Sequence, residues 1–355
     1  MGKKKIGLLT FCDNTNFGSY LQTYGLYIAV LSEGYDIELI DYQKKVPDYE
    51  KMSISGFVRA IKQRGWLYGY IFAKNIYDMQ KQFSRLISET MKKSGKYTRS
   101  NINKCENNYK TVLVGSDLVW DKRYANDYTY MIDFSDTVKK IAYAASCGYE
   151  SVPNEEKEFF IRYLSKFSMI SVREQNFKKQ LEDLLNKEVF LVCDPTMLCE
   201  NSFWIDFVVD APRPFQKEYV LVYMPDSDNK IIGVAKRYSR KNRLKLLVIG
   251  KEDECICPKS PKEFLTLIYY ANKVFTGSYH GLLFSLYYKK QVNYINRKPE
   301  NRIKTVATKL DIEEFEITNS GYNIEKTIDF TKEKLYEKEF REESKEVLRK
   351  MLNCL

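Results

Sequence analysis

Short apolar runs alternate with helical patterns along most of this chain, an arrangement typical of α/β folds. Residues 5–12 form the first apolar run and predict a strand. A turn-rich stretch follows, and apolar residues then recur at helical spacing until Gly34, after which residues 37–42 predict the next strand. This succession is a βαβ unit, and the loop after its first strand lies where open α/β sheets place ligands. Because that loop lacks the G-x-G-x-x-G sequence, dinucleotide binding has no direct support.

The later apolar runs predict two α/β units joined by a linker. Strands are expected at residues 111–115, 140–144, 169–172, 189–192, 219–223, 244–249, 273–276 and 291–295. The Pro-rich residues 211–214 are the best linker. We therefore predict two Rossmann-like domains facing a cleft, at residues 1–211 and 216–325. Residues 326–355 hold a charged amphipathic helix, which would pack back on the first domain or form a subunit contact; we predict the former.

Residues 54–95 read as a helical insertion in the first domain with many aromatic side chains. The aromatic residues are Phe57, Trp66, Tyr68, Tyr70, Phe72, Tyr77 and Phe83. Lys62, Arg64 and Lys74 lie among them. These rings either pack on the sheet, as aromatic residues at helical spacing commonly do, or form a surface that touches a membrane or a lipid-linked substrate.

The composition of the chain limits the kinds of site and partner that it can have. The 355 residues include one histidine, His280, so a histidine-cluster metal site is excluded and we predict no metal. The net charge of +10 is spread along the chain and suits an anionic substrate or a membrane surface, and without a zinc-finger or RNA-binding motif we expect no nucleic-acid partner. The first residues do not form a signal peptide, and no apolar run reaches the roughly 18 residues of a membrane span. We read a cytoplasmic protein with reduced thiols.

Polar residues with turn chemistry follow several predicted strands, and in a two-domain α/β fold they would point at the cleft. These segments are residues 13–19 with Gln22, 115–120, 171–174, 193–196 and 277–281.

His280 lies just after the predicted strand 273–276, where a helix should begin. The amides of that first turn can bind an anion, and Ser278 is placed to cap the helix. A histidine beside a bound anion can pass protons near neutral pH. We therefore favour a proton-transfer role for His280 over one in which it only caps or packs.

Arg173 follows the predicted strand 169–172, where its guanidinium can hold a phosphate or carboxylate through paired hydrogen bonds. The alternative is a salt bridge to Glu174 or Asp194, and the sequence leaves both open. Asp117 and Asp194 precede turn-forming residues, which favours a helix cap or a turn position for each.

Taken in order, these segments resemble the polysaccharide pyruvyl transferase family. The matching stretches are Lys5–Gly7, Asn16–Gln22, Val114–Trp120, Ile141–Gly148, Ile170–Glu174, Asp194–Thr196 and Gly277–Ser285. Together they cover the chain from residue 5 to about residue 310, and the ordered set is specific although no single stretch is decisive.

The resemblance implies two Rossmann-like domains similar to the B-type glycosyltransferase fold. It implies a transferase that moves the enolpyruvyl group of phosphoenolpyruvate onto a sugar as a pyruvate ketal and releases phosphate. The family generally serves the synthesis of bacterial capsule, exopolysaccharide or cell-wall polymers. Phosphoenolpyruvate would be a co-substrate, and no cofactor is expected.

Carried onto this sequence, His280 resembles the family's catalytic histidine, Arg173 resembles an arginine that contacts phosphoenolpyruvate, and Asp194 resembles a polar residue at the same cleft. We predict His280 and Asp194 as catalytic. Many members carry an arginine two residues before the histidine, where this chain has Ser278.

Arg297, Lys298 and Arg302 follow the next predicted strand and could supply the missing cation, and we prefer Arg302. The predicted donor-binding residues are Arg173, Ser278, Gly281 and Arg302. The predicted acceptor-binding residues, all in the first domain, are Asn14, Asn16, Gln22 and Asp117.

Two other functions stay open on the same fold, because a fold does not fix a function. They are a glycosyltransferase that uses a nucleotide sugar and a non-catalytic binding protein of envelope assembly. For the pyruvyl transferase we expect as acceptor a sugar of a surface polysaccharide or of its lipid-linked oligosaccharide precursor. The aromatic and basic helical segment and the positive charge would then place the protein at the inner face of the membrane.

Overall fold

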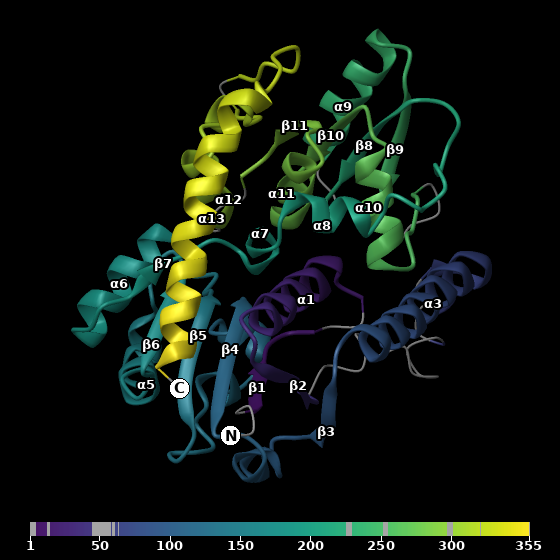
Figure 1. The fold of residues 1–355 in the computed structure, drawn as a ribbon. Helices are drawn as coiled ribbons and strands as arrows, with labels where there is room; N and C mark the ends of the chain where they lie inside the picture. Colours follow the sequence, from purple (N-terminus) through teal and green to yellow (C-terminus); the bar gives the residue numbers. More distant parts are fainter. Residues whose placement is uncertain are drawn as a thin grey trace.

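The chain folds around two parallel β-sheets, one in each of two domains (Figure 1). The computed structural model describes residues 5–12, 15–44, 58, 61–62, 64–224, 229–250, 255–296, 301–319 and 321–354, with the backbone alone for residues 301 and 332–336. Asn14, Phe57, Arg297 and Lys298 lie outside these described residues.

The first domain holds a seven-stranded sheet in the order β3-β2-β1-β4-β5-β6-β7. Its strands are β1 (Lys5–Leu9), β2 (Asp36–Tyr42), β3 (Lys93–Tyr97), β4 (Thr111–Asp117), β5 (Lys139–Ala145), β6 (Met169–Val172) and β7 (Phe190–Leu191). Its helices are α1 (Phe17–Ser32), α3 (Trp66–Thr90), α4 (Lys122–Ala125), α5 (Asn154–Leu164), α6 (Gln175–Leu185), α7 (Pro195–Leu198) and α8 (Asn201–Asp206). Every residue of β4 is buried, because helices cover both faces of this sheet. Leu113 packs with the cluster of α1, whereas Val112 and Val114 pack with that of α5 and α6.

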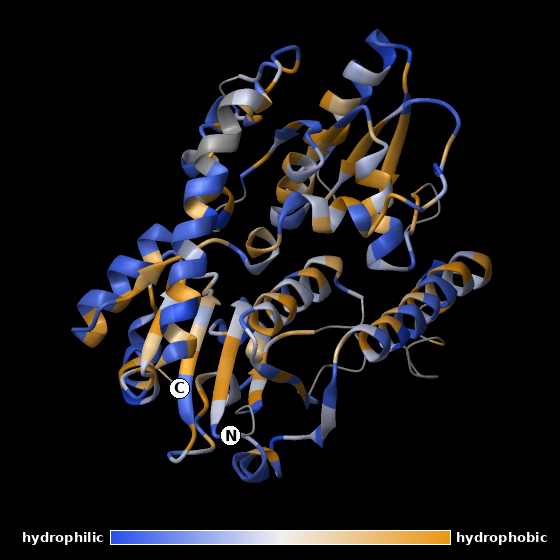
Figure 2. Cartoon of the chain, viewed as in Figure 1, coloured by the Kyte–Doolittle hydropathy of each residue, from blue (hydrophilic) through white to orange (hydrophobic). Residues whose placement is uncertain are grey.

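The second domain holds a four-stranded parallel sheet in the order β11-β10-β8-β9. Its strands are β8 (Tyr219–Tyr223), β9 (Lys245–Ile249), β10 (Lys273–Thr276) and β11 (Gln291–Tyr294). Its helices are α9 (Asn229–Lys241), α10 (Pro261–Tyr269), α11 (Tyr279–Tyr287) and α12 (Asn301–Lys309). Figure 2 shows that the central strands of both sheets are largely hydrophobic, as expected for parallel sheets. Residues 207–218, which contain the predicted linker, form neither helix nor strand.

Each sheet reverses its strand order once, between β1 and β4 in the first domain and between β8 and β10 in the second. Ligands of open α/β sheets bind beyond the carboxyl ends of the strands at such points. The helices that follow β1 and β10 meet there, since Gly18 of α1 packs directly on His280 of α11. The carboxyl edges of the two sheets therefore face each other.

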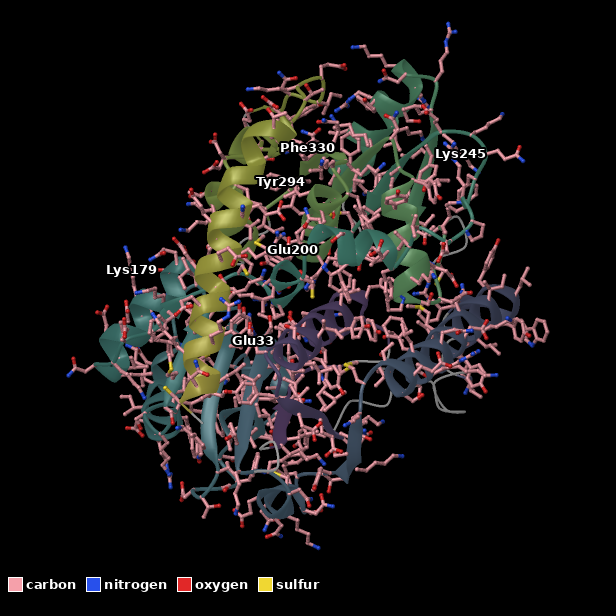
Figure 3. The ribbon with its side chains drawn as sticks, in the orientation of Figure 1. Glu33, Lys179, Glu200, Lys245, Tyr294 and Phe330 are labelled. Carbon is pink, nitrogen blue, oxygen red and sulfur yellow. The ribbon has the colours of Figure 1, made fainter. Side chains whose placement is uncertain are left out.

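The C-terminal helix, α13 (Phe330–Asn353), runs from the second domain back along the first (Figure 1). The Tyr35 hydroxyl donates to the Leu352 carbonyl at 3.0 Å, and the Cys193 amide donates to Ser344 Oγ at 2.8 Å. Glu33 and Glu200, both labelled in Figure 3, pair with arginines of this helix. The helix thus contacts the first domain, where the sequence placed it.

The helical segment predicted at 54–95 contains one long described helix, α3, followed by β3. The apolar pattern did not predict β3, because its sequence Lys-Ser-Gly-Lys-Tyr carries little hydrophobicity and it pairs as an edge strand with β2 alone. Within the part of the chain that the structure describes, no helix combines the length and the apolar character needed to cross a membrane.

Arg341 fastens α13 to the first domain. Its buried guanidinium donates to the Met197 carbonyl at 2.6 Å, to Glu200 at 2.9 Å and to Asn201 at 2.9 Å, and also pairs with Glu337.

We therefore expect Arg341→Ala to lower the free energy of unfolding by about 3 kcal/mol, because it leaves buried acceptors without a donor. The matched control is Arg349→Ala on the same helix, whose half-exposed ion pair with Glu33 should contribute about 0–1 kcal/mol. Urea denaturation measures both, and equal losses would contradict the anchoring role of Arg341.

Candidate active site

His280 stands at the start of α11, held by a capped turn. Ser278 is the N-cap, and its Oγ accepts from the Gly281 amide at 3.2 Å, while the Ser278 amide donates to Thr276 Oγ1 at 3.0 Å. The imidazole is buried against Gly18 so closely that a Cβ at position 18 would overlap the ring. His280 Nε2 is buried and has no hydrogen-bond partner among the described residues.

Asp194 connects the histidine to an arginine. Its Oδ1 caps α7 by accepting from the Thr196 amide at 2.9 Å and from Thr196 Oγ1 at 2.7 Å. Its Oδ2 accepts from Arg173 Nη1 at 2.6 Å and lies 3.6 Å from His280 Nε2, too far for a hydrogen bond but close enough for electrostatic attraction. Burial would raise the pKa of Asp194, but the positive charges of His280 and Arg173 and the Thr196 amide together lower it below its usual value. Asp194 is therefore both a helix cap and an ionised partner of the two cations.

Arg173 is almost fully buried at the end of β6, and it uses only part of its hydrogen-bonding capacity. Nη1 donates to Asp194, whereas Nε and Nη2 have no hydrogen-bond partner among the described residues. Its Cζ lies 5.1 Å from the ring centroid of Tyr279. The salt bridge that the sequence left open is present, and two further donors remain for an anion.

Arg302 of α12 lies beside Arg173, although it comes from the other domain. Asp117 Oδ1 is 3.5 Å from Arg302 Nη1 and 3.8 Å from Arg173 Nη2. Arg302 Cζ lies 5.7 Å from the Tyr279 ring centroid, so both guanidiniums share one carboxylate and one aromatic ring. Asp117 holds its place with a left-handed backbone, at φ +74°, and it caps no helix. Such strain in a non-glycine residue is frequent at functional sites.

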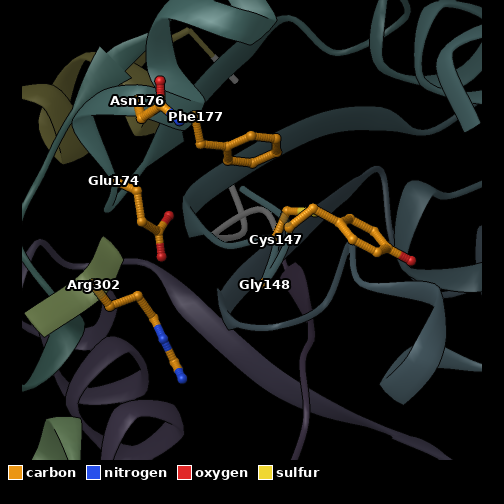
Figure 4. A pocket seen from close by; sticks show the side chains of 7 residues that line it. Cys147, Gly148, Glu174, Asn176, Phe177 and Arg302 are labelled. Atoms are coloured by element: carbon orange, nitrogen blue, oxygen red, sulfur yellow. The ribbon is translucent and has the colours of Figure 1, made fainter. Parts of the chain in front are cut away.

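Glu174 is a buried cleft residue that the sequence considered only as a partner for Arg173. Ser146 Oγ donates to Glu174 Oε1, and Oε2 has no hydrogen-bond partner among the described residues. Burial raises the pKa of Glu174, although the charges of Arg173 and Arg302 act in the opposite direction. The carboxylate and Arg302 line one pocket together with Gly148 (Figure 4). The apolar run of β6 is followed by two adjacent charged residues, Arg173 and Glu174, and this is the sequence signal that could have placed Glu174 at the strand end as well.

The other predicted donor residues have clear local roles. Ser278 forms the cap of α11, as expected. The Gly281 amide donates to that cap instead of remaining free for an anion, and its missing Cβ allows close packing on Thr276.

The predicted acceptor residues are scattered, and Asn14 lies outside the described residues. Asn16 is exposed and caps α1, accepting from the Ser19 amide at 3.2 Å. Gln22 is fully buried, and its amide donates to the Phe11 carbonyl at 3.0 Å, which holds the loop after β1. Among the three described residues of this group, Asp117 alone lies beside the arginines. Acceptor binding by these residues stays a prediction.

No group of His, Cys, Asp and Glu side chains within the described part of the chain could hold a metal ion. The site instead brings the guanidiniums of Arg173 and Arg302 and the imidazole of His280 together. The carboxyl groups beside them are those of Asp194, Asp117 and Glu174. Such a set can bind a small polyanion and exchange a proton with it.

The chain belongs to the polysaccharide pyruvyl transferase family, whose model matches residues 16–299. It is therefore a pyruvyl transferase of polysaccharide synthesis, with a sugar or polysaccharide as acceptor.

Its structure is similar to that of a putative UDP-N-acetylglucosamine 2-epimerase from Listeria monocytogenes, with 12% identity, a TM-score of 0.51 and coverage of 97% of this chain and 91% of that chain. It is also similar to UDP-GlcNAc 2-epimerase from Neisseria meningitidis bound to UDP-GlcNAc, with 10% identity, a TM-score of 0.50 and coverage of 99% and 100%. At these identities the likeness shows the fold alone, and it confirms the predicted fold of two Rossmann-like domains found in B-type glycosyltransferases. No curated protein matches the chain in sequence.

The two buried carboxylates should affect stability with opposite pH dependence. The pKa of Asp194 is lowered in the folded state, so its contribution is complete above its unfolded pKa of about 3.9 and is lost as the pH falls towards the lower folded value. We expect Asp194→Asn, which can still cap α7, to cost about 3 kcal/mol at pH 7 because it leaves Arg173 without its partner, and to cost less in acid.

Glu174→Gln is the matched variant. Because the pKa of Glu174 is raised in the folded state, ionisation of this group opposes folding, and the wild type should gain stability relative to Glu174→Gln as the pH falls. Urea denaturation over a pH series gives both differences, and the same sign for the two would contradict the assigned environments.

Gly18 should be essential for the placement of the imidazole. Gly18→Ala should displace the ring and lower stability by about 1–3 kcal/mol through overpacking. Because His280 is the one histidine of the chain, its imidazole gives a single set of NMR signals that reports the displacement directly. Gly95→Ala is the control, since a Cβ there meets no described atom. Unchanged imidazole signals in a folded Gly18→Ala protein would show that the ring does not depend on this contact.

Proposed function

We propose that this pyruvyl transferase takes its pyruvyl group from phosphoenolpyruvate, joins it to two hydroxyls of one sugar as a cyclic ketal and releases inorganic phosphate. The observation that carries the proposal is the buried Arg173, whose Nε and Nη2 have no described hydrogen-bond partner, beside Arg302 of the facing domain. Phosphoenolpyruvate carries about three negative charges near neutral pH, given a second phosphate pKa near 6. A carboxylate and a phosphate on one small molecule match two neighbouring guanidiniums.

His280 is the proposed proton carrier. In the protonated form it gives its proton to the methylene carbon of phosphoenolpyruvate, and the neighbouring Asp194 carboxylate stabilises the imidazolium before transfer. The electron pair of the C=C bond forms the new C–H bond, and C2 becomes electrophilic. A sugar hydroxyl adds to C2, and its proton returns to His280.

The second step closes the ring. The phosphate oxygen leaves C2 with the bonding electrons, a second hydroxyl of the sugar takes its place, and the proton of that hydroxyl leaves with the phosphate. Charge balances, because a trianion gives a ketal carboxylate and a hydrogen phosphate dianion, and His280 ends protonated as it began. Arg173 and Arg302 hold the departing phosphate while negative charge gathers on it.

The acceptor proposed is a sugar of a bacterial surface polysaccharide or of its lipid-linked precursor. The proposed acceptor contacts are Asn16, the cap of α1 after β1, and Asp117, the last residue of β4, both at the carboxyl edge of the first sheet. The family assignment supports a sugar acceptor.

Two variants separate donor binding from turnover. Arg173→Lys keeps the charge but not the fork of donors, so we expect at least roughly tenfold weaker binding of phosphoenolpyruvate. His280→Gln should bind phosphoenolpyruvate nearly normally and lose about 10²–10⁴-fold in phosphate release with a competent acceptor. Calorimetric titration with phosphoenolpyruvate and a phosphate assay give the two quantities.

UDP-GlcNAc serves as the competing ligand in the same titration, because the Neisseria meningitidis epimerase of similar fold was solved with it. Binding of UDP-GlcNAc without binding of phosphoenolpyruvate would favour the glycosyltransferase alternative and overturn the proposed donor. Near-normal phosphate release by folded His280→Gln would remove the proton-carrier role.

A further inference from the structure

Exposed apolar side chains gather at one end of α3. Of the eleven large hydrophobic side chains exposed among the described residues, six lie between Val58 and Tyr77. Trp66 is the most exposed of all, at 72%, and its indole stacks on the Tyr70 ring with the centroids 6.0 Å apart. On the surfaces of soluble proteins, exposed apolar side chains usually occur singly, so a cluster of this kind indicates an interaction surface.

The cluster is separate from the buried face of the same helix. The buried residues of α3 are Gly69, Ala73, Ile76, Met79, Phe83 and Ile87. Trp66, Tyr70 and Tyr77 are spaced by four and seven residues, so they form one stripe along the helix beside this face. We call Trp66, Tyr70 and Tyr77 the aromatic stripe. The sequence left open whether the aromatic residues of this segment pack or face outward. Both occur on different sides of the helix. Phe83 packs on Phe17 with 5.6 Å between the ring centroids, whereas the aromatic stripe is exposed.

Positive charge accompanies the aromatic stripe. Lys74 and Lys81 are exposed one turn away from Tyr70 and Tyr77, with Lys74 paired to Asp78 at 2.8 Å, and Arg64 is exposed just before the helix. Among the described residues, no side chain caps the first turn of α3 and no acidic residue stands in it. The amide end of the helix therefore adds to the positive potential.

We propose that the aromatic stripe docks on an anionic membrane surface. Tyrosine and tryptophan rings carry an apolar body and a polar edge, which suits the headgroup layer of a bilayer, and lysines beside them attract lipid phosphates. A second copy of this chain would bring the same positive charges against each other, so charge favours the lipid surface over self-association. In Figure 1 the N-terminal end of α3 stands at the margin of the molecule, away from the strands of both sheets, where it can reach a surface.

This helix packs on α1, the helix that contacts His280 of the candidate active site. Phe83 of α3 contacts Phe17, the neighbour of the Gly18 that touches His280, and Lys259 of the second domain bonds to Asn75. A membrane held by the aromatic stripe would keep the cleft close to the lipid surface. That location suits a lipid-linked sugar acceptor. This last step rests on the proposed function, whereas the membrane docking itself does not.

The test measures vesicle binding of the full chain without substrates, so it is independent of the proposed reaction. Wild-type protein should sediment with vesicles of phosphatidylcholine mixed with phosphatidylglycerol, more weakly with phosphatidylcholine alone, and less as salt rises. The Trp66→Ala/Tyr70→Ala/Tyr77→Ala variant should bind the anionic vesicles roughly tenfold more weakly, and a cooperative thermal unfolding transition shows that it remains folded.

The control is Tyr124→Ala/Ile161→Ala/Tyr322→Ala, which removes three exposed hydrophobic side chains elsewhere and should bind like the wild type. Wild-type protein that stays in the supernatant with anionic vesicles would overturn the proposal, as would equal binding by the two triple variants. Light scattering adds a further check: a wild-type dimer that the aromatic-stripe variant dissociates would identify the stripe as a contact between copies and would also overturn it.

Discussion

One buried carboxylate organises the cleft. Asp194 caps α7, accepts from Arg173 and lies beside His280, so three groups from different elements take their positions from two oxygens. Arg173 and Asp194 belong to the first domain and His280 to the second, so this cluster also spans the domain interface. A buried guanidinium without a partner would be severely destabilising, and the ionised state of Asp194 is therefore part of the fold as much as of the chemistry.

The hydrogen bonds within this cluster leave some of its buried donors without an acceptor. Arg173 keeps Nε and Nη2 without a described hydrogen-bond partner, and Asp117 Oδ1 lies 3.8 Å from Nη2. Buried donors left in this state raise the free energy of the empty site. On the proposed function, phosphoenolpyruvate would accept these hydrogen bonds and remove that cost.

Much of this arrangement could be predicted from particular residues. Uninterrupted apolar runs such as 111–115 and 169–172 identify buried parallel strands, and the rule that ligands meet strand ends selects Arg173, Asp194 and His280. Sequence could not decide between a salt bridge and an anion clamp for Arg173, since one guanidinium has donors for both. It could not predict β3, which is held by backbone pairing at an edge. Nor could it separate buried Phe83 from exposed Tyr77, because which side of α3 is covered depends on Phe17, distant in sequence.

Ser278 occupies the position where many family members carry an arginine, and in this chain Arg302 of α12 lies beside Arg173 instead. Ser278 caps α11, and an arginine there could not accept the Gly281 amide, a loss of about 1 kcal/mol. This chain keeps the cap and brings Arg302 from α12, where the Tyr279 ring provides a common aromatic neighbour for both guanidiniums. Because Arg173 and Arg302 come from different domains, an anion that contacts both has its highest affinity for the domain arrangement that brings them together. On the proposed function, donor binding and the approach of the two domains would therefore be thermodynamically linked.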